Sequence, residues 1–304
     1  MAHVTARRIL VVGEALIDIV RRADGRIEEI PGGSPANVAI TLGRLGRSPR
    51  LLTALGADGH GGVLRDWLAE SGVDVAHAEI PRTATATAEL DGTGAATYVF
   101  DIAWSLSGAT TEDADVIHVG SIAGLLEPGA DEVLRIVEAG RPGALVTYDP
   151  NIRPALVSDG ADTRRRVESL VAQADVVKAS DEDLHWLYPG FDPRDAARAW
   201  QASGPAVVIV TEGAKGAFAV ADCGELEVPG RRVSVVDTVG AGDTFMGALI
   251  DGLISAGWVD GTARDALRAA DSAQLASILD WAARAAAVTV SRPGADPPRR
   301  GEVA

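Results

Sequence analysis

A glycine-rich turn with an aspartate on either side is the part of this sequence best suited to chemistry. It reads "DTVGAGDTF", from Asp237 to Phe245, and an apolar run that predicts a helix follows at once. The first N–H groups of a helix have no partner within the helix, and together with the helix dipole they form a binding site for an anion. The turn lacks the lysine of the P-loop pattern G-x-x-x-x-G-K-[ST]. It places the carboxylate of Asp243 beside the anion site instead.

Phosphoryl transfer is a reaction that needs both an anion site and a carboxylate. The N–H groups of Gly240, Ala241 and Gly242 would stabilise charge on the transferred group. Asp243 would accept the proton of the attacking hydroxyl. The alternative is purely structural: Asp243 caps the helix, a role that aspartate fills well, and the glycines only form the turn.

The composition excludes several classes of function. A net charge of −15 over 304 residues argues against nucleic acid and against an anionic membrane surface, but a nucleotide needs only a local positive site. The one cysteine, Cys223, can form no intrachain disulfide, which suits a reducing cytoplasm. Glu14 and Asp18 interrupt the first apolar run, so we interpret it as a strand and not as a signal peptide. No run of about 18 apolar residues predicts a membrane span.

Strand patterns and helix patterns alternate along the chain. The predicted strands cover 9–14, 50–56, 115–120, 144–149, 175–180 and 205–213, with two short ones near 216–220 and 225–229. The predicted helices cover 34–46, 61–72, 130–140, 164–174, 241–256 and 272–290, the first with Ser34 as N-cap, Pro35 at the first helical position and Gly46 at its end. This alternation predicts one α/β domain over 1–304, with a central, mostly parallel sheet and helices on both faces.

Two features of this fold locate a ligand site. Ligands of such sheets bind at the carboxyl ends of the strands. Those ends are Gly13–Asp18, Gly120–Ser121, Asp149–Arg153, Ser180–Asp183 and Thr211–Gly213. The segment 82–104 interrupts the alternation with two short strands around "DGTG", a hairpin signal, and 15–30 can supply further strands. We expect these two segments to form a small antiparallel lid over the pocket.

A second motif gives the sequence a family resemblance. "GGSPANVAITLGRLG", from Gly32 to Gly46, places two glycines and Asn37 at a helix start. With "DTVGAGD" it resembles the two signatures of the ribokinase/PfkB family of carbohydrate kinases, and the likeness extends to "VVGEALIDI", "LGADGHGGVLRDWLAESGVDV", "DPNIRP", "TEGAKGA" and "AAAVTVSRPGADPP". The resemblance implies a ribokinase-like fold, ATP as phosphoryl donor and a sugar as acceptor.

The resemblance also implies roles for individual residues. Asp243 would be the general base, and Gly240, Ala241 and Gly242 would form the anion hole. The sugar hydroxyls would meet Asp18, Gly32, Gly33 and Asn37, whose polar groups suit vicinal hydroxyls. The nucleotide would meet Lys178, Thr211 and Gly213, together with Gly240 and Gly242, while Lys215 is better explained as a solvated loop charge. In the lid, Phe100, with Tyr98 and Trp104, would either cover the sugar or pack the lid against the core.

The resemblance implies metal ions as well. Mg²⁺ is expected with ATP, where it bridges phosphate oxygens. The family often has N-x-x-E near this ion, and this chain reads Ser180-Asp181-Glu182-Asp183. Asp183 holds the matching place with Glu182 in reserve, both acting mostly through water, although a helix cap with a charged first turn explains them equally. A possible potassium site would use Asp237 and the backbone of Val239, Thr289, Arg292 and Gly294, although a structural role in its own turn is the alternative for Asp237.

The choice of sugar rests on finer details of the same motifs. Ribokinases typically have asparagine where this chain has Leu16, and lysine where it has Ser34. "GEALIDI", "GGSPANVA" and "DPNIRP" look like the fructokinase branch, which implies D-fructose converted to fructose 6-phosphate. Ribose stays an alternative, as does 2-keto-3-deoxygluconate, whose carboxylate Arg153 would clamp. A catalytically silent sugar- or nucleotide-binding protein is the non-enzyme alternative, and we expect a monomer or a homodimer through the lid.

Overall fold

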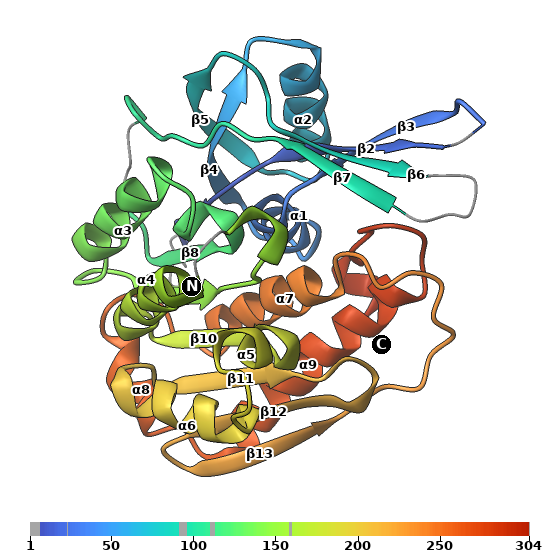
Figure 1. Ribbon diagram of the computed structural model, residues 1–304. Helices are drawn as coiled ribbons and strands as arrows, with labels where there is room; N and C mark the ends of the chain where they lie inside the picture. The colour runs from blue at the N-terminus through green and yellow to red at the C-terminus, as the bar shows by residue number, and fades with distance from the viewer. Residues whose placement is uncertain (1–6, 23, 91–95, 110–112, 158–159, 304) are drawn as a thin grey trace.

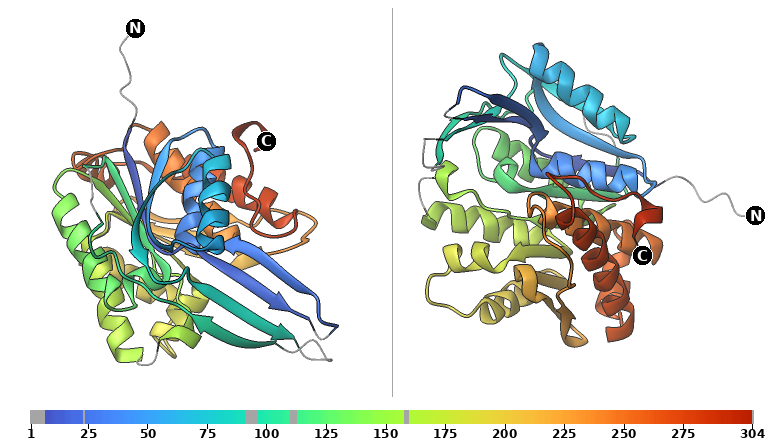
Figure 2. Two further views of the ribbon diagram at one scale, coloured as in Figure 1. Left: turned by 90° about the horizontal axis from the view of Figure 1, so that it is seen from above. Right: turned by 90° about the vertical axis from the view of Figure 1, so that its right-hand side faces the viewer.

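The computed structural model describes residues 7–22, 24–90, 96–109, 113–157 and 160–303 (Figure 1). The predicted turn "DGTG", residues 91–94, lies outside the described residues. The chain forms a large sheet between two layers of helices, and a smaller sheet extends from one side of it (Figures 1 and 2). This arrangement confirms the predicted α/β class.

The large sheet has the strand order β13-β12-β11-β10-β9-β8-β1-β4-β5. Its strands are β1 (Ile9–Val12), β4 (Pro49–Gly56), β5 (Asp74–Ile80), β8 (Val116–Gly120), β9 (Leu145–Asp149), β10 (Val176–Ser180), β11 (Val207–Thr211), β12 (Gly216–Ala221) and β13 (Gly224–Pro229). All neighbours pair in parallel except β11 with β12 and β12 with β13. The parallel strands therefore bring their carboxyl ends to one edge.

Helices cover both faces of this sheet. They are α1 (Ser34–Arg44), α2 (Gly59–Glu70), α3 (Gly129–Gly140), α4 (Gly160–Gln173), α5 (Asp181–Leu187), α6 (Pro193–Ser203), α7 (Ala241–Ser255), α8 (Ala263–Arg268) and α9 (Ser272–Val290), with 3-10 turns at Ser121–Gly124, Pro154–Leu156, Gly213–Lys215 and Arg300–Glu302. One apolar core lies under α1, α2, α7, α8 and α9, and a second lies under α3 to α6. Alternate strand residues feed the two cores: Ile9 and Val11 enter the first, Leu10 and Val12 the second.

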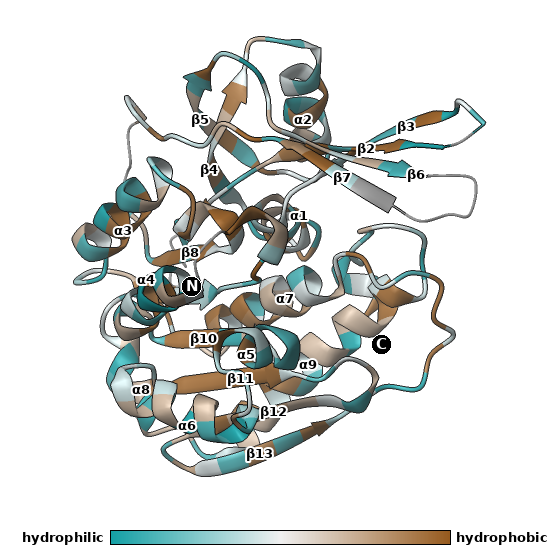
Figure 3. Ribbon diagram, in the orientation of Figure 1, coloured by the Kyte–Doolittle hydropathy of each residue, from teal (hydrophilic) through white to brown (hydrophobic). Residues whose placement is uncertain are grey.

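Hydropathy follows this layered arrangement. The inner strands are among the most apolar parts of the ribbon, whereas helices such as α3 and α8 carry polar residues on their outer surface (Figure 3). Both faces of the sheet are covered, so its strands read as nearly continuous apolar runs, for example "ILVV" and "VVIVT". Among the described residues, no helix is both long enough and apolar enough to cross a membrane.

Four elements of the large sheet and its helix layers were not predicted: β5, α5, α6 and α8. Edge strand β5 leaves most of its residues exposed or half-buried, so it lacks the apolar run of an inner strand. The helix α6 does carry a start signal in the sequence, because Asp192 caps it and Pro193 occupies its first turn. The helices α5 and α8 are only 7 and 6 residues long, too short to show an apolar period.

The smaller sheet has the strand order β3-β2-β6-β7 and is called the lid below. Its strands are β2 (Leu16–Arg21), β3 (Ile27–Gly32), β6 (Thr85–Leu90) and β7 (Ala96–Asp101). Both hairpins are antiparallel, but the central pair, β2 with β6, is parallel, which the antiparallel expectation missed. The parallel pairing follows from the connectivity. β2 continues β1 and β6 continues β5, so both segments leave the large sheet at the carboxyl ends of its parallel strands.

Candidate active site

The start of α7 forms the centre of the site. Gly240 is the N-cap, with a left-handed φ of 73°, and a Cβ atom there would lie 2.6 Å from Cβ of Ala295. Glycine is therefore required both for the turn and for the close approach. Every residue of α7 from Asp243 to Ile254 is buried. Packing along the helix therefore holds its first turn in place.

The carboxylate of Asp243 is buried and held by other segments of the chain. Asp243 is 6% exposed. Its Oδ1 accepts hydrogen bonds from Oγ of Ser34 at 2.7 Å and Nδ2 of Asn151 at 3.3 Å, and its Oδ2 accepts one from Nδ2 of Asn37 at 2.8 Å. The structural alternative for Asp243, a helix N-cap, is wrong, because Gly240 has that position.

The start of α1 also differs from the sequence prediction. The N-cap is Gly33, whose φ is 107°, and a Cβ atom there would lie 2.6 Å from the carbonyl oxygen of Glu14. The predicted cap, Ser34, is the first helical residue and makes no capping bond. Its hydroxyl is directed to Asp243 instead. The two glycine motifs therefore meet across the site.

Asn151 belongs to the site, although the sequence alone predicted no role for it. It lies just after β9 with a φ of 36°, a left-handed conformation that asparagine tolerates better than most residues. Its Nδ2 donates to Ser34 at 2.8 Å, and its Oδ1 accepts from Arg153 at 2.6 Å. Asn151 thereby joins the carboxylate of Asp243 to the guanidinium of Arg153. The motif "DPNIRP" was the signal in the sequence.

The lid register places four residues in one row across its strands. Asp18 on β2 pairs with Ile30 on β3 and with Ala86 on β6, and Ala86 pairs with Phe100 on β7. Residues paired in this way lie on one face of a sheet. Gly32 lies beside the carboxylate, because a Cβ atom there would be 2.5 Å from Oδ2 of Asp18.

Aromatic residues of the lid segment have two different environments. The rings of Tyr98 and Phe100 stack with centroids 6.0 Å apart, and Tyr98 is 60% exposed. Trp104 is buried, and its Nε1 donates to the carbonyl oxygen of Ala123 at 3.0 Å. Trp104 therefore packs the lid segment against the core and does not cover the sugar.

Two acidic groups near Arg153 have raised pKa values. Burial raises the pKa of Asp18 to about 6, and the charge of Arg153 acts in the opposite direction. Burial raises the pKa of Glu14 to about 7, opposed by a hydrogen bond with Ser121 and by Arg153. Glu14 is 4% exposed, and among the described residues its Oε2 has no hydrogen-bond partner. Both carboxylates belong to the segment Gly13–Asp18 at the carboxyl end of the first predicted strand, but no role was predicted for Glu14 from the sequence.

A pocket of about 320 Å³ leads away from the start of α7. Thr211, Gly213 and Gly242 line it together with Ala241, so the structure brings three of the expected nucleotide residues together, whereas Gly240 and Lys178 are not among its lining residues. Small apolar residues of α9 form another wall: Ala283, Ala286, Ala287 and Val290. Lys215 is not among its lining residues.

Lys178 lies beside this pocket, beneath the glycine turn. It comes from β10, is 3% exposed, and donates from Nζ to Oδ2 of Asp149 at 2.8 Å. A Cβ atom on Gly242 would lie 3.0 Å from this Nζ. The positive charge that the glycine turn itself lacks is thus supplied by a neighbouring strand.

The residues expected near Mg²⁺ have strong structural contacts. The carboxylate of Asp183 accepts hydrogen bonds from the backbone N–H groups of Ile152 and Ser180 and from the Ser180 hydroxyl, and it completes a capping box for α5. Glu182 is exposed. Within the described part of the chain, no group of three or more His, Cys, Asp or Glu side chains is arranged to hold a metal. Direct coordination of Mg²⁺ by Asp183 fits poorly, because three donors already bind its carboxylate.

The loops expected to bind potassium lie against each other. Asp237 accepts hydrogen bonds from the N–H groups of Val239 at 3.0 Å and Gly294 at 2.9 Å, and these bonds lower its pKa. Thr289 is fully buried, with its hydroxyl 2.9 Å from that of Thr244. The side chain of Arg292 is a cation that pairs with Glu302 at 2.8 Å, so only the backbone carbonyl of Arg292 is suited to bind a potassium ion.

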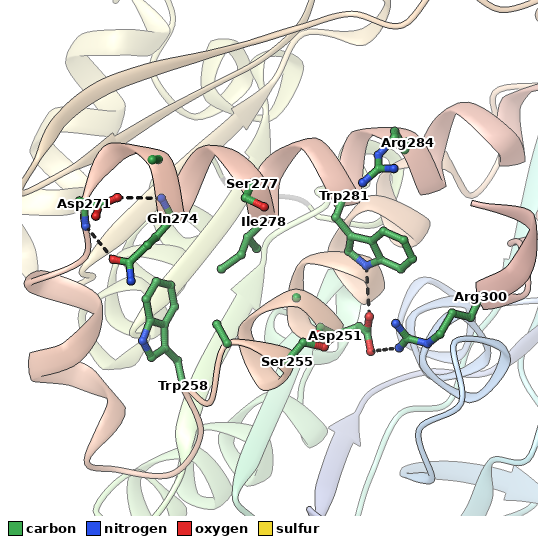
Figure 4. A pocket seen from close by; sticks show the side chains of 13 residues that line it. Asp251, Ser255, Trp258, Asp271, Gln274, Ser277, Ile278, Trp281, Arg284 and Arg300 are labelled. Atoms are coloured by element: carbon green, nitrogen blue, oxygen red, sulfur yellow. Dashed lines mark hydrogen bonds and ion pairs between the residues drawn. The ribbon is translucent and has the colours of Figure 1, made fainter. Parts of the chain in front are cut away.

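A larger cavity, of about 720 Å³, lies away from the strand ends, between α7 and α9 (Figure 4). Asp251 faces it and is nearly fully buried, but its carboxylate accepts from Nε1 of Trp281 at 3.1 Å and from Arg300 at 2.5 Å. Arg47 binds the same carboxylate at 2.7 Å. These contacts attach the C-terminal segment to α7 and α1, and the reacting groups lie elsewhere.

The fold and the site together define a class of protein. A carboxylate at the start of a buried helix, backbone N–H groups beside it and a pocket leading away are the parts of a phosphoryl transferase that uses a nucleotide. The model of the pfkB family of carbohydrate kinases matches residues 6–300. The chain therefore belongs to the pfkB family and is a carbohydrate kinase, which confirms the resemblance found in the two glycine motifs.

Individual relatives are similar over most of their length. A fructokinase of Rhizobium leguminosarum bv. trifolii is 34% identical, covering 81% of this chain and 79% of the relative. The crystal structure of a fructokinase from Xylella fastidiosa with bound ATP has a TM-score of 0.84 at 28% identity, over 95% of this chain and 94% of that one. A double mutant of the Vibrio cholerae fructokinase, solved with fructose, ADP and a potassium ion, has a TM-score of 0.77 at 26% identity, over 95% and 94%.

Proposed function

We propose that this kinase transfers the γ-phosphoryl group of ATP to the 6-hydroxyl of D-fructose and forms fructose 6-phosphate. The observation that carries the proposal is the position of Asp243. Its carboxylate stands between the sugar-side residues, Asn37 and Asn151, and the pocket whose near end is Gly242. A donor and an acceptor bound on these two sides would meet at the same carboxylate.

Asp243 then acts as the general base. It takes the proton of the sugar hydroxyl as that oxygen forms its bond to the γ-phosphorus, and the bond from phosphorus to the ADP oxygen breaks. Hydrogen bonds from Ser34, Asn37 and Asn151 fix the orientation of the carboxylate. The N–H groups of Gly240, Ala241 and Gly242 stabilise charge on the transferred group.

The nucleotide occupies the pocket between β11, β12 and α9. Its base packs against the alanines of α9, and its phosphates extend past Thr211 and Gly213 to the glycine turn. Lys178 contacts a phosphate oxygen. Bound Mg²⁺ would neutralise charge on the phosphates, and Asp183 and Glu182 would hold its water ligands. A potassium ion at Asp237 and the nearby carbonyl groups of Val239, Thr289, Arg292 and Gly294 would steady the turn.

The sugar binds under the lid. Asp18 and Asn37 bind its hydroxyls, Gly32 and Gly33 leave room for it beside the start of α1, and Phe100 covers it from the same lid row as Asp18. Arg153 contacts a sugar oxygen while Asn151 holds its guanidinium. Neutral sugars suit this site better than a sugar acid, because the acidic side chains of Asp18, Glu14 and Asp243 lie around Arg153, the cation that a sugar acid would need.

A comparison of substrates tests the proposal directly. We would measure kcat/KM for fructose, ribose and 2-keto-3-deoxygluconate with the same ATP and magnesium concentrations. Fructose is expected to be the best of the three. A rival at least tenfold better would overturn the choice of sugar, and no turnover with any sugar would favour the silent binding protein. Omitting magnesium or potassium in turn tests each ion.

The state of the protein in the cell is also a proposal. Exposed apolar residues of the lid, Ile27, Ile30, Tyr98 and Val99, favour a homodimer through the lid over a monomer. Light scattering would distinguish the two states. The one cysteine is free and exposed, and it suits the reducing cytoplasm that we propose as the compartment.

A further inference from the structure

We propose that Asp149 is a positioning residue for the reaction, which holds the ammonium group of Lys178 against the glycine turn of the anion hole. The inference deepens the proposed function and rests on it. A P-loop carries its lysine within the loop, whereas this chain has two lysines in all and neither is in the turn. In this chain Lys178 on β10 supplies the positive charge, and Asp149 on β9 holds it in place.

The geometry of the pair is tightly constrained. Asp149 is fully buried, Lys178 is 3% exposed, and their side chains form a 2.8 Å hydrogen bond between neighbouring strands of the sheet. An ammonium group has three N–H donors. Asp149 is the acceptor that the described residues give it, so donors remain for a phosphate oxygen. Gly242 lies close enough that its missing side chain leaves the room that this ammonium uses.

The surrounding charges keep the ammonium protonated. Burial lowers the pKa of Lys178, but the carboxylates of Asp149, Asp183 and Asp243 outweigh burial, so the pKa lies above its usual value. Burial raises the pKa of Asp149 only to about 6, so the pair is ionised at neutral pH. His118, packed beneath on β8, stays neutral because burial and Lys178 lower its pKa to about 3.

An ion pair that only stabilises the fold would not have to lie against the anion hole. The chain offers one for comparison at the opposite end of β10, where Asp175 is equally buried and pairs with Arg264 at 2.6 Å. That pair bonds only to structural groups, including the N–H of Val146 and the carbonyl oxygen of Ala144. Asp149 differs because its partner lies against the anion hole, and Asp175→Asn is therefore the matched control.

A double-mutant cycle on kcat tests the inference. We expect Lys178→Met to lower kcat by about 100-fold or more, as removal of a preorganised anion contact does. Asp149→Asn should lower kcat by at least about tenfold with KM for fructose nearly unchanged. The double variant should be no slower than Lys178→Met, within about threefold, because Asp149 acts only through Lys178. Asp175→Asn should lower the melting temperature and leave kcat intact.

Several results would overturn the inference. One is wild-type kcat in folded Asp149→Asn, and another is a double variant whose loss equals the product of the two single losses. If Asp149→Asn does not fold, Asp149→Glu keeps the charge but displaces the ammonium, and an unchanged kcat there would count equally against positioning. If the unmodified enzyme phosphorylates sugars in any of these cases, the proposed function stands while the role of Asp149 falls.

Discussion

Three side chains from two distant segments hold the carboxylate of Asp243, and this arrangement makes it testable as a base. Asp243→Asn keeps the shape of the side chain but removes its ability to take a proton. We expect kcat to fall by about 10²–10⁴-fold, the usual contribution of a general base, with ATP affinity and melting temperature close to those of the unmodified enzyme. Turnover within about threefold of the original would show that Asp243 only organises its neighbours.

Gly242 lies against the ammonium group of Lys178, so a side chain at this position is expected to disturb the anion hole. In Gly242→Ala, the new methyl group would lie 3.0 Å from Nζ of Lys178, which is buried and cannot move freely. We expect a clear loss of kcat with little loss of stability. The control is Gly62→Ala in α2, where nothing lies within 4 Å and the helix should gain up to about 1 kcal/mol. Equal kcat in both variants would remove the proposed conflict with Lys178.

The pKa of Glu14 predicts a pH dependence of stability. The unfolded carboxyl group loses its proton near pH 4.5, whereas the folded one keeps it until about pH 7. The native state therefore binds more protons in this interval, and stability falls as pH rises through it, by on the order of 3 kcal/mol. Thermal unfolding from pH 4.5 to 8 should show Glu14→Gln gaining on the unmodified protein as pH rises. A constant difference in melting temperature would contradict the raised pKa.

At the scale of elements, the lid is the part of the fold with the least support. Its two hairpins extend from the main body (Figure 2), and β3 is exposed over most of its length. Elements with few buried contacts open easily, so we expect hydrogen exchange in β2, β3, β6 and β7 to slow when fructose binds.

The measurement has an internal control in the large sheet. Strands β10 and β11 are buried on both faces and should exchange equally slowly with and without sugar. A second control replaces fructose by a sugar that the enzyme does not phosphorylate. Unchanged exchange throughout the lid at saturating fructose would mean that these strands are a fixed wall of the site.

At the scale of the whole molecule, Asp251 connects three parts of the chain. Its buried carboxylate binds Trp281 on α9 and Arg300 near the C-terminus (Figure 4). It also binds Arg47, which follows α1. We expect Asp251→Ala to lower the free energy of unfolding by about 3 kcal/mol, because the buried acceptor is lost and its donors lose their partner. Denaturant unfolding measures this change.

A surface ion pair supplies the comparison for Asp251. Asp222 pairs with Arg268 at 3.4 Å while both side chains stay 41% exposed. Asp222→Ala should change stability by less than about 1 kcal/mol, as is usual for exposed pairs. Neither variant should change kcat strongly, since both carboxylates lie away from the start of α7. Similar losses in the two variants would mean that burial of Asp251 adds nothing.

The local order of the chain follows from its sequence alone. Apolar runs of strand length and helices with cap signals gave the alternation, and alternation requires a parallel sheet whose carboxyl ends meet. Two glycine motifs, each readable within about fifteen residues, gave the family. These features can be recognised in one sequence because each depends only on residues that are close together in the chain. The glycine turn around Gly240 is an example.

Only the tertiary structure decided which side chains meet. Asn37 and Asp243 are 206 positions apart, and Lys178 reaches Gly242 from another strand, so no local pattern could place them together. For the same reason the sequence predicted the wrong role for Ser34. Its local pattern is that of an N-cap, but its hydroxyl donates to Asp243, which is distant in the chain. Packing of α7 between its neighbours, and the register of adjacent strands, fix these contacts. The sequence therefore identifies the segments that form the site, and the packing of the buried helix α7 brings their side chains into contact.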